Sequence, residues 1–203
     1  MSGIKGAFFD FDGVITIEKQ GSPTIISYIS NELGIPYDRV EKAYCKHNKD
    51  LLLGNITHRD MWDEFCSDVG QVIDYQVLED AFMNVTIDGK MIDYIKELRK
   101  DYLIGMITDN KADRIKALVD KPELKGLFDV VIISAEVHGR KSKKKIFEEA
   151  LRQSKLKAED CVFIDNTAFN LEKPSEMGFH TLFFDDEKRD YSELDRLIGR
   201  NDI

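Results

Sequence analysis

Short, uninterrupted apolar runs separate longer amphipathic stretches along this chain. The runs lack the alternation of a half-exposed strand, and most are rich in β-branched or aromatic residues, which is typical of strands buried on both faces. They are therefore predicted to form a parallel sheet that helices cover on both sides. The five predicted strands are Lys5–Phe9, Tyr102–Ile107, Asp129–Ile133, Cys161–Ile164 and His180–Phe184.

Amphipathic patterns with helical spacing lie between the later strands, at residues 89–101, 112–120 and 142–155. In the first of these, apolar residues recur every three or four positions, which predicts a helix with one buried face. A regular alternation of strand and helix with short connections favours an α/β fold, with a Rossmann-like, doubly wound parallel sheet.

The segment between the first two strands breaks this alternation. It contains no convincing strand, and Thr57 followed by Asp60 predicts a capping box at a helix start. We therefore expect a small all-helical domain at residues 17–87, inserted into an α/β core domain formed by residues 1–16 and 88–203. The predicted helices of the insert are Ser22–Leu33, Pro36–Leu53, Thr57–Val69 and Asp74–Asn84.

Polar residues end or directly follow the predicted strands. Because the carboxyl ends of parallel strands meet at one edge of a sheet, where α/β folds bind ligands, these side chains are expected to share a site. Turns favour aspartate, which is enough to explain Asp185 but not the whole set. The set comprises Asp10, Thr108 with Asp109, Ser134, Asp165 and Asp185.

Clustered carboxylates repel one another, so the predicted site needs a cation. A hard divalent ion such as Mg²⁺ suits the oxygen ligands of Asp10, Asp12 and Asp165. Magnesium held by few protein ligands usually has a phosphate as co-ligand, which indicates phosphoryl chemistry. A carboxylate can itself attack phosphorus and form an aspartyl-phosphate.

Composition narrows the possible partners. The net charge of −9 disfavours general nucleic-acid binding, although Arg140 and Lys141 begin a short basic cluster. The three cysteines have no metal-ligand spacing, and no apolar run approaches the ~20 residues of a membrane span. No signal-peptide pattern opens the chain. We expect a cytoplasmic protein that binds neither nucleic acid nor membrane.

Four segments, in order, resemble the motifs of the haloacid dehalogenase superfamily of phosphohydrolases. They are "FFDFDGVI", "GMITDN", "GRKSKKKIFEEAL" and "VFIDNTAFNL". The resemblance implies that Asp10 is the nucleophile and Asp12 the general acid/base, which must hold a proton for the leaving oxygen. It also implies that Thr108 binds phosphate and that Lys141, counted back from Ile146-Phe147, is the phosphate-binding lysine.

The same resemblance implies the rest of the site. Asp10, Asp12, Asp165 and Asn166 would hold Mg²⁺, and Asn166 replaces an acid of the family pattern, so weaker metal binding is a hypothesis. Gly13, Asp109 and Asn110 would bind the substrate phosphate, with Gly13 relieving crowding near it. The insert is similar to a C1-type cap, and "LLLGNITHRDMWDEF" resembles the branch that includes the epoxide-hydrolase N-terminal phosphatase domain.

The sequence thus predicts a Mg²⁺-dependent phosphatase that acts on a small phosphate ester through an aspartyl-phosphate. Two alternatives stay open: a phosphomutase of the β-phosphoglucomutase type, and a module that senses phosphate or metal with little turnover. Haloacid dehalogenase chemistry ranks lower because Asp12 is present, and that branch normally lacks it. The substrate and the oligomeric state are left undetermined.

Overall fold

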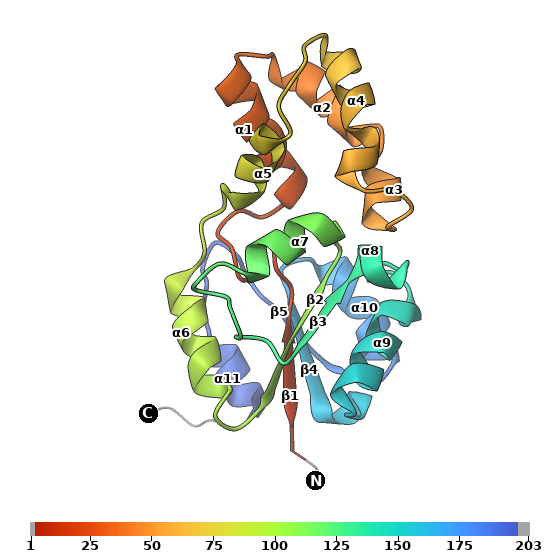
Figure 1. Cartoon of the computed structure of the whole chain (residues 1–203). Coiled ribbons are helices and arrows are strands. Elements are labelled where there is room, and N and C mark those ends of the chain that lie inside the picture. Colours follow the sequence, from red (N-terminus) through yellow and green to blue (C-terminus); the bar gives the residue numbers. More distant parts are fainter. Residues whose placement is uncertain (1–2, 199–203) are drawn as a thin grey trace.

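A computed structural model describes residues 3–198 of the chain. Its centre is one parallel sheet of five strands in the order β3-β2-β1-β4-β5, with β1 in the middle (Figure 1). The predicted doubly wound parallel sheet is confirmed. No strand begins or ends more than one residue from its predicted position. The strands are β1 (Gly6–Phe9), β2 (Leu103–Thr108), β3 (Val130–Ile133), β4 (Cys161–Asp165) and β5 (His180–Phe183).

Helices cover both faces of the sheet because successive side chains of each strand point to opposite faces. In β1, Ala7 and Phe9 pack into the apolar cluster that also holds residues of α6 and α11, whereas Phe8 packs against α9. Figure 1 shows α6 and α11 on one side of the sheet and α9 and α10 on the other. These helices are α6 (Gly89–Leu98), α9 (Lys144–Ser154), α10 (Ala168–Glu176) and α11 (Ser192–Ile198).

Two short helices follow strands of the sheet, and one 3₁₀ turn precedes a strand. Helices α7 (Ala112–Val119) and α8 (Ser134–Val137) begin within four residues of the ends of β2 and β3, at the carboxyl edge of the sheet. A 3₁₀ turn, Ala158–Asp160, leads into β4. Figure 1 shows both helices at the edge of the sheet that faces the group of helices above it.

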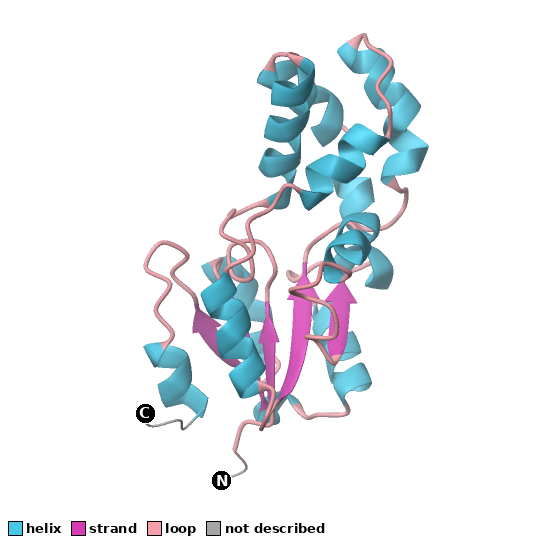
Figure 2. Cartoon of the chain, turned by 60° about the vertical axis from the view of Figure 1, so that its left-hand side comes forward, coloured by secondary structure: helices cyan, strands magenta, loops and turns pink. Residues whose placement is uncertain are grey.

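The residues between β1 and α6 form a group of helices above that edge, and we call residues 21–83 the helical insert (Figures 1 and 2). It has an apolar core of its own, with Ile29, Phe65 and Leu78 fully buried. The predicted capping box of Thr57 and Asp60 is confirmed. The helices are α1 (Gly21–Leu33), α2 (Tyr37–Cys45), α3 (Asn48–Leu52), α4 (His58–Val69) and α5 (Gln76–Met83).

The single helix predicted at Pro36–Leu53 is wrong, because α2 and α3 are separate. His47 leaves helical geometry with φ −106° and ψ 2°. The break lets the end of α3 turn toward the sheet, where the backbone oxygen of Leu52 accepts a hydrogen bond from the Ser134 hydroxyl at 2.8 Å. The pattern of apolar residues continues through this break, so the sequence pattern does not reveal the break.

Two connecting segments join the helical insert to the sheet side by side. Thr16 and Ile87 form an antiparallel bridge, and the Asp88 amide donates to the Ile15 oxygen at 2.9 Å. Arg189, which follows β5, fastens both segments. Its guanidinium donates to the Gly13 and Val14 oxygens at 3.0 and 2.6 Å and pairs with Asp88 at 2.7 Å.

The helical insert also contacts α7 through a buried histidine. His58 is fully buried, and its Nδ1 lies 2.8 Å from an Asp113 oxygen, while its Nε2 lies 2.8 Å from the Tyr44 hydroxyl. Both ring nitrogens are therefore engaged, one across the boundary to α7 and one inside the insert. Within residues 3–198, none of the helices is long and apolar enough to cross a membrane.

Tight packing across β1 and β2 yields a first prediction. A Cβ added to Gly105 would lie 2.3 Å from the nearest atom of the Phe8 ring, whereas one added to Gly89 would have no neighbour within 4 Å. Gly105→Ala should therefore lower the free energy of unfolding by about 1–3 kcal/mol, as overpacked cores do. Gly89→Ala should leave it unchanged or raise it slightly. Urea unfolding measures both, and equal midpoints for the two variants would contradict the packing described here.

The burial of His58 makes stability depend on pH. Burial lowers the pKa of His58 below its ordinary value of 6.5, although the hydrogen bond that Asp113 accepts from His58 opposes this. The unfolded chain therefore binds this proton more readily, so the free energy of unfolding should fall as the pH drops below about 6.5. His58→Gln should flatten this slope in urea unfolding, and His180→Gln, at an exposed position, should keep it. A wild-type slope in His58→Gln would contradict the prediction.

Candidate active site

The register of the central strands brings the predicted strand-end residues together. Phe9, the last residue of β1, pairs with Met106 of β2 and Ile164 of β4. The next residue, Asp10, donates its amide to the Ile164 oxygen at 2.9 Å, which sets it beside Asp165, the last residue of β4. The carboxyl edge of the sheet therefore carries these carboxylates together, as the sequence predicts.

A buried lysine joins two of these carboxylates. The Nζ of Lys141 lies 2.7 Å from Asp10 Oδ1 and 2.7 Å from Asp165 Oδ2, and only 1% of the residue is exposed. Burial raises the pKa of Asp10 to about 7, although Lys141 opposes the rise. Burial also works against the charge of Lys141, but Asp10 and Asp165 together raise its pKa above the ordinary value. Lys141 is thus a fixed positive charge against Asp10.

Asp12 is held in a different way. The two Asp12 oxygens accept hydrogen bonds from both terminal nitrogens of the Arg114 guanidinium at 2.8 Å, and Asn110 Nδ2 donates at 2.8 Å. Burial disfavours the charge on Asp12, but Arg114 and Asn110 outweigh burial and hold its pKa below the ordinary value. Arg114 and Asn110 therefore favour the carboxylate form of Asp12, and its role as a proton donor stays a prediction.

Two residues after β2, Asp109 and Asn110, line the site and are held there by hydrogen bonds. Asp109 accepts hydrogen bonds from the Lys141 amide at 2.8 Å and from Arg140 Nε at 3.0 Å, so it fixes the loop that carries Lys141. The Asn110 side chain, beyond its bond to Asp12, accepts from Arg114 at 3.0 Å. The structure thus gives Asp109 and Asn110 positioning contacts where the sequence suggested phosphate ligands.

Gly13 is required at its position by both conformation and space. Its φ is +82°, which favours glycine, and a Cβ there would lie 2.1 Å from Asn166 Nδ2. Asn166 in turn donates from Nδ2 to Asp186 Oδ2 at 2.9 Å. The carbonyl oxygen of Asn166 is the atom of this side chain that can face a cation.

The oxygen atoms open to a metal ion are fewer than the sequence suggests. Asp165 accepts hydrogen bonds from Lys141, from the Thr167 amide at 2.7 Å and from Asn170, so both of its oxygens are engaged. The Asp12 carboxylate is engaged by Arg114. In the described part of the chain, no three His, Cys, Asp or Glu side chains are grouped to hold a metal ion.

The site nevertheless fits a magnesium ion that is held by only two protein oxygens. Asp10 Oδ1 contacts Lys141, and Oδ2 is the oxygen that contact leaves open. Asp10 Oδ2 and the side-chain carbonyl oxygen of Asn166 are two hard oxygen donors, and both residues line the same pocket. Mg²⁺ commonly binds through one or two protein oxygens and completes its shell with water and substrate phosphate. These two residues match that pattern.

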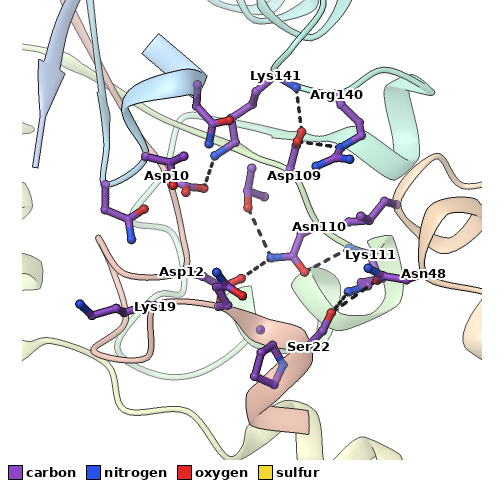
Figure 3. Close-up of a pocket in the computed structure, with 18 of the residues that line it drawn as sticks. Asp10, Asp12, Lys19, Ser22, Asn48, Asp109, Asn110, Lys111, Arg140 and Lys141 are labelled. Atoms are coloured by element: carbon purple, nitrogen blue, oxygen red, sulfur yellow. Dashed lines mark hydrogen bonds and ion pairs between the residues drawn. The ribbon is translucent and has the colours of Figure 1, made fainter. Parts of the chain in front are cut away.

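A pocket of about 560 Å³ lies between the carboxyl edge of the sheet and the helical insert. Figure 3 shows Asp10, Asp12 and Lys141 on one side of it and Ser22 and Asn48, from α1 and α3, on the other. Thr108, at the end of β2, also lines the pocket and is buried. The pocket therefore has one wall from each part of the chain.

Several residues of this site were not found from the sequence: Arg114, Lys111, Ser22, Asn48 and Asn170. Arg114, in the first turn of α7, follows Asn110 of the preceding loop by four positions, and this short separation is the one signal that could have linked Arg114 to the motif. Ser22 and Asn48 belong to separate helices of the insert and show no pattern in common with the strand ends.

Solved structures with the same fold come from distant proteins. The chain resembles an HAD family enzyme, bt-2542, from Bacteroides thetaiotaomicron, with 20% identity over 95% of this chain and 98% of that one, and a TM-score of 0.78. It also resembles a predicted HAD-like family hydrolase from Porphyromonas gingivalis, with 22% identity, 98% and 99% coverage and a TM-score of 0.74. An HAD phosphatase from Thermococcus onnurineus matches with 19% identity, 98% and 100% coverage and a TM-score of 0.67.

The bt-2542 enzyme has also been solved with magnesium and inorganic phosphate. No curated protein matches the chain in sequence. The family model of the haloacid dehalogenase-like hydrolases matches residues 4–172, which covers both the strand-end motifs and the helical insert. The chain belongs to this family of hydrolases.

Proposed function

We propose that the protein is a Mg²⁺-dependent phosphatase that hydrolyses a small phosphate monoester through an aspartyl-phosphate on Asp10. The observation that carries this proposal is the Lys141 ammonium, buried 2.7 Å from Asp10 at the floor of the pocket. A carboxylate with a fixed cation beside it suits attack on phosphorus, since the cation offsets charge on the transferring group.

In the first step, an Asp10 oxygen forms a bond to phosphorus, the bond from phosphorus to the ester oxygen breaks, and the leaving oxygen takes a proton from water and departs as the alcohol. Thr108 and Lys141 lie on the same pocket and would bind the phosphoryl oxygens. In the second step, water attacks phosphorus, the bond to Asp10 breaks, and inorganic phosphate is released. Asp10 is thereby restored as a carboxylate.

Asp12 would accept the proton of the attacking water and then release it to solvent, which restores its carboxylate. Its carboxylate form, stabilised by Arg114 and Asn110, suits a base. Donation of a proton to the leaving oxygen, which the family resemblance also implies, requires Asp12 to be protonated against the stabilisation that Arg114 provides. The base role is therefore the one that this geometry favours.

Asp10 and Asn166 would hold the magnesium ion with their oxygen atoms. The bound ion would supply positive charge to the phosphoryl oxygens. This ligand set is smaller than the four residues that the sequence suggests, because Asp12 and Asp165 have other partners. It is consistent with the magnesium and phosphate found together in the bt-2542 enzyme.

The helical insert, with its connecting segments at residues 17–87, would act as a cap on the core formed by residues 1–16 and 88–203. It contributes one wall of the pocket through Ser22 and Asn48. Residues so placed meet the leaving group and not the phosphate, and a cap that closes on substrate excludes bulk water from the reaction.

The proposal predicts metal-dependent hydrolysis that requires Asp10. Wild-type protein should release p-nitrophenol from p-nitrophenyl phosphate with Mg²⁺, and EDTA should abolish this release. Asp10→Asn should lower kcat by roughly 10³-fold or more, as loss of a nucleophile does. Borohydride reduction during turnover should convert residue 10 to homoserine, which mass spectrometry detects.

Asp93→Asn is the matched control, because Asp93 is exposed on α6 and far from the strand ends in sequence. It should keep wild-type activity. Equal activity of Asp10→Asn and wild type, or hydrolysis that EDTA leaves intact, would refute the proposed function. Transfer of phosphate to a second hydroxyl without net release would instead identify a mutase.

The pairing of Arg114 with Asp12 should be visible in stability. Arg114→Met leaves a largely buried carboxylate without its cation, and it should lower the free energy of unfolding by about 3–5 kcal/mol. Arg114→Met combined with Asp12→Asn should recover part of the loss, because no unpaired charge stays buried. Arg152→Met, which removes an exposed pair with Glu149, should not shift the urea midpoint. A wild-type midpoint for Arg114→Met would contradict this account.

A further inference from the structure

Three cationic side chains are buried in the described part of the chain, and they differ in their partners. Lys141 contacts two carboxylates and Arg114 contacts one. Lys111 is only 4% exposed, yet within residues 3–198 no carboxylate oxygen lies within 4.0 Å of its ammonium. A buried ammonium without a counter-ion is costly, so the position of Lys111 calls for an explanation.

The ammonium of Lys111 lies against the pocket and reaches the helical insert. It donates to the Ser22 hydroxyl at 2.6 Å, and Ser22 donates to Asn48 Oδ1 at 3.4 Å (Figure 3). All three residues line the pocket that Asp10 also lines. One ammonium hydrogen is used by Ser22, and the Asn48 amide nitrogen is a further donor in the same corner.

This corner differs from the phosphate end of the pocket. The phosphate end is formed by Asp10, Thr108 and Lys141, whereas Lys111 and its partners stand on the side of α1 and α3 (Figure 3). Burial, followed by the nearby Arg114, lowers the pKa of Lys111 to about 8. An anion in contact with the ammonium would favour its charged form and supply the counter-ion that Lys111 lacks.

We propose that Lys111, together with Ser22 and Asn48, binds a carboxylate on the leaving group, so that the substrate is a phosphorylated carboxylic acid. This inference rests on the function proposed above and names the substrate class of that site. A carboxylate accepts several hydrogen bonds in one plane and would pair with the ammonium at close range. Glu41, the carboxylate of the insert that lines the same pocket, is exposed and lies outside contact distance of Lys111.

The test compares matched phosphate esters that differ only in the group at the far end of the leaving group. One member ends in a carboxylate and the other in a primary alcohol, as in 2-phosphoglycolate and 2-hydroxyethyl phosphate, with further pairs lengthened by one and two carbons. With Mg²⁺, wild-type kcat/KM should favour the carboxylate member of at least one pair by about tenfold or more. A wild-type ratio near one in every pair would overturn the proposal.

Variants of Lys111 test whether this side chain causes the preference for the carboxylate member. Lys111→Met should bring the ratio close to one, and Lys111→Arg should retain part of it, because it keeps the charge. Lys116→Met is the matched control: Lys116 lies on α7, is exposed and pairs with Glu136, and its loss should leave the ratio unchanged. An unchanged ratio in Lys111→Met would overturn the assignment. If that variant does not fold, Ser22→Ala should reduce the ratio and serves in its place.

Failure of the proposed function gives a different result from failure of this inference. Should no ester be hydrolysed, calorimetric titration of the same pairs with Mg²⁺ still measures binding. Tighter binding of the carboxylate member, lost in Lys111→Met, would support the carboxylate site without the phosphatase. Equal binding of both members would overturn it. Hydrolysis of p-nitrophenyl phosphate with no preference in any pair would leave the phosphatase and reject the site.

Discussion

The ion pair of Lys141 with Asp10 and Asp165 is the interaction on which the site depends. It joins the ends of two neighbouring strands to a loop that comes from elsewhere in the chain, and it lies where burial makes each of these charges costly alone. Asp109 fixes the same loop through the Lys141 amide. Positive charge is thus built into the sheet edge before any ligand binds.

A second ion pair gives the two carboxylates of the first motif different surroundings. Asp10 has a lysine on one oxygen, with the other left open, whereas both oxygens of Asp12 are taken by Arg114. Two acids that stand one residue apart in sequence therefore have opposite shifts of pKa.

The fold could be predicted from the sequence because its signals are local. The strands are continuous apolar runs, and the capping box of Thr57 and Asp60 spans only four residues. The choice of Lys141 among several lysines came from the family resemblance, through its position relative to Ile146-Phe147. The partners of Asp12 and Asp165 could not be predicted, since Arg114 lies 102 residues from Asp12 and no local pattern encodes that contact. Hydrogen bonds decide which carboxylate oxygens are open, and they form only in the folded chain.

Arg189 limits where the protein can bend. By holding the Gly13 and Val14 oxygens and Asp88, it makes the first residues of both connecting segments part of the sheet body. A pivot for the helical insert is then restricted to the few residues between the Thr16–Ile87 bridge and the first and last helices of the insert. Rotation there would carry Ser22 and Asn48 away from Lys111 while Asp10 and Lys141 stay in register. Under the proposed function, the contacts of the insert with the leaving group could therefore change while the residues placed for phosphoryl transfer stay fixed, so the insert could diverge in sequence without disturbing them.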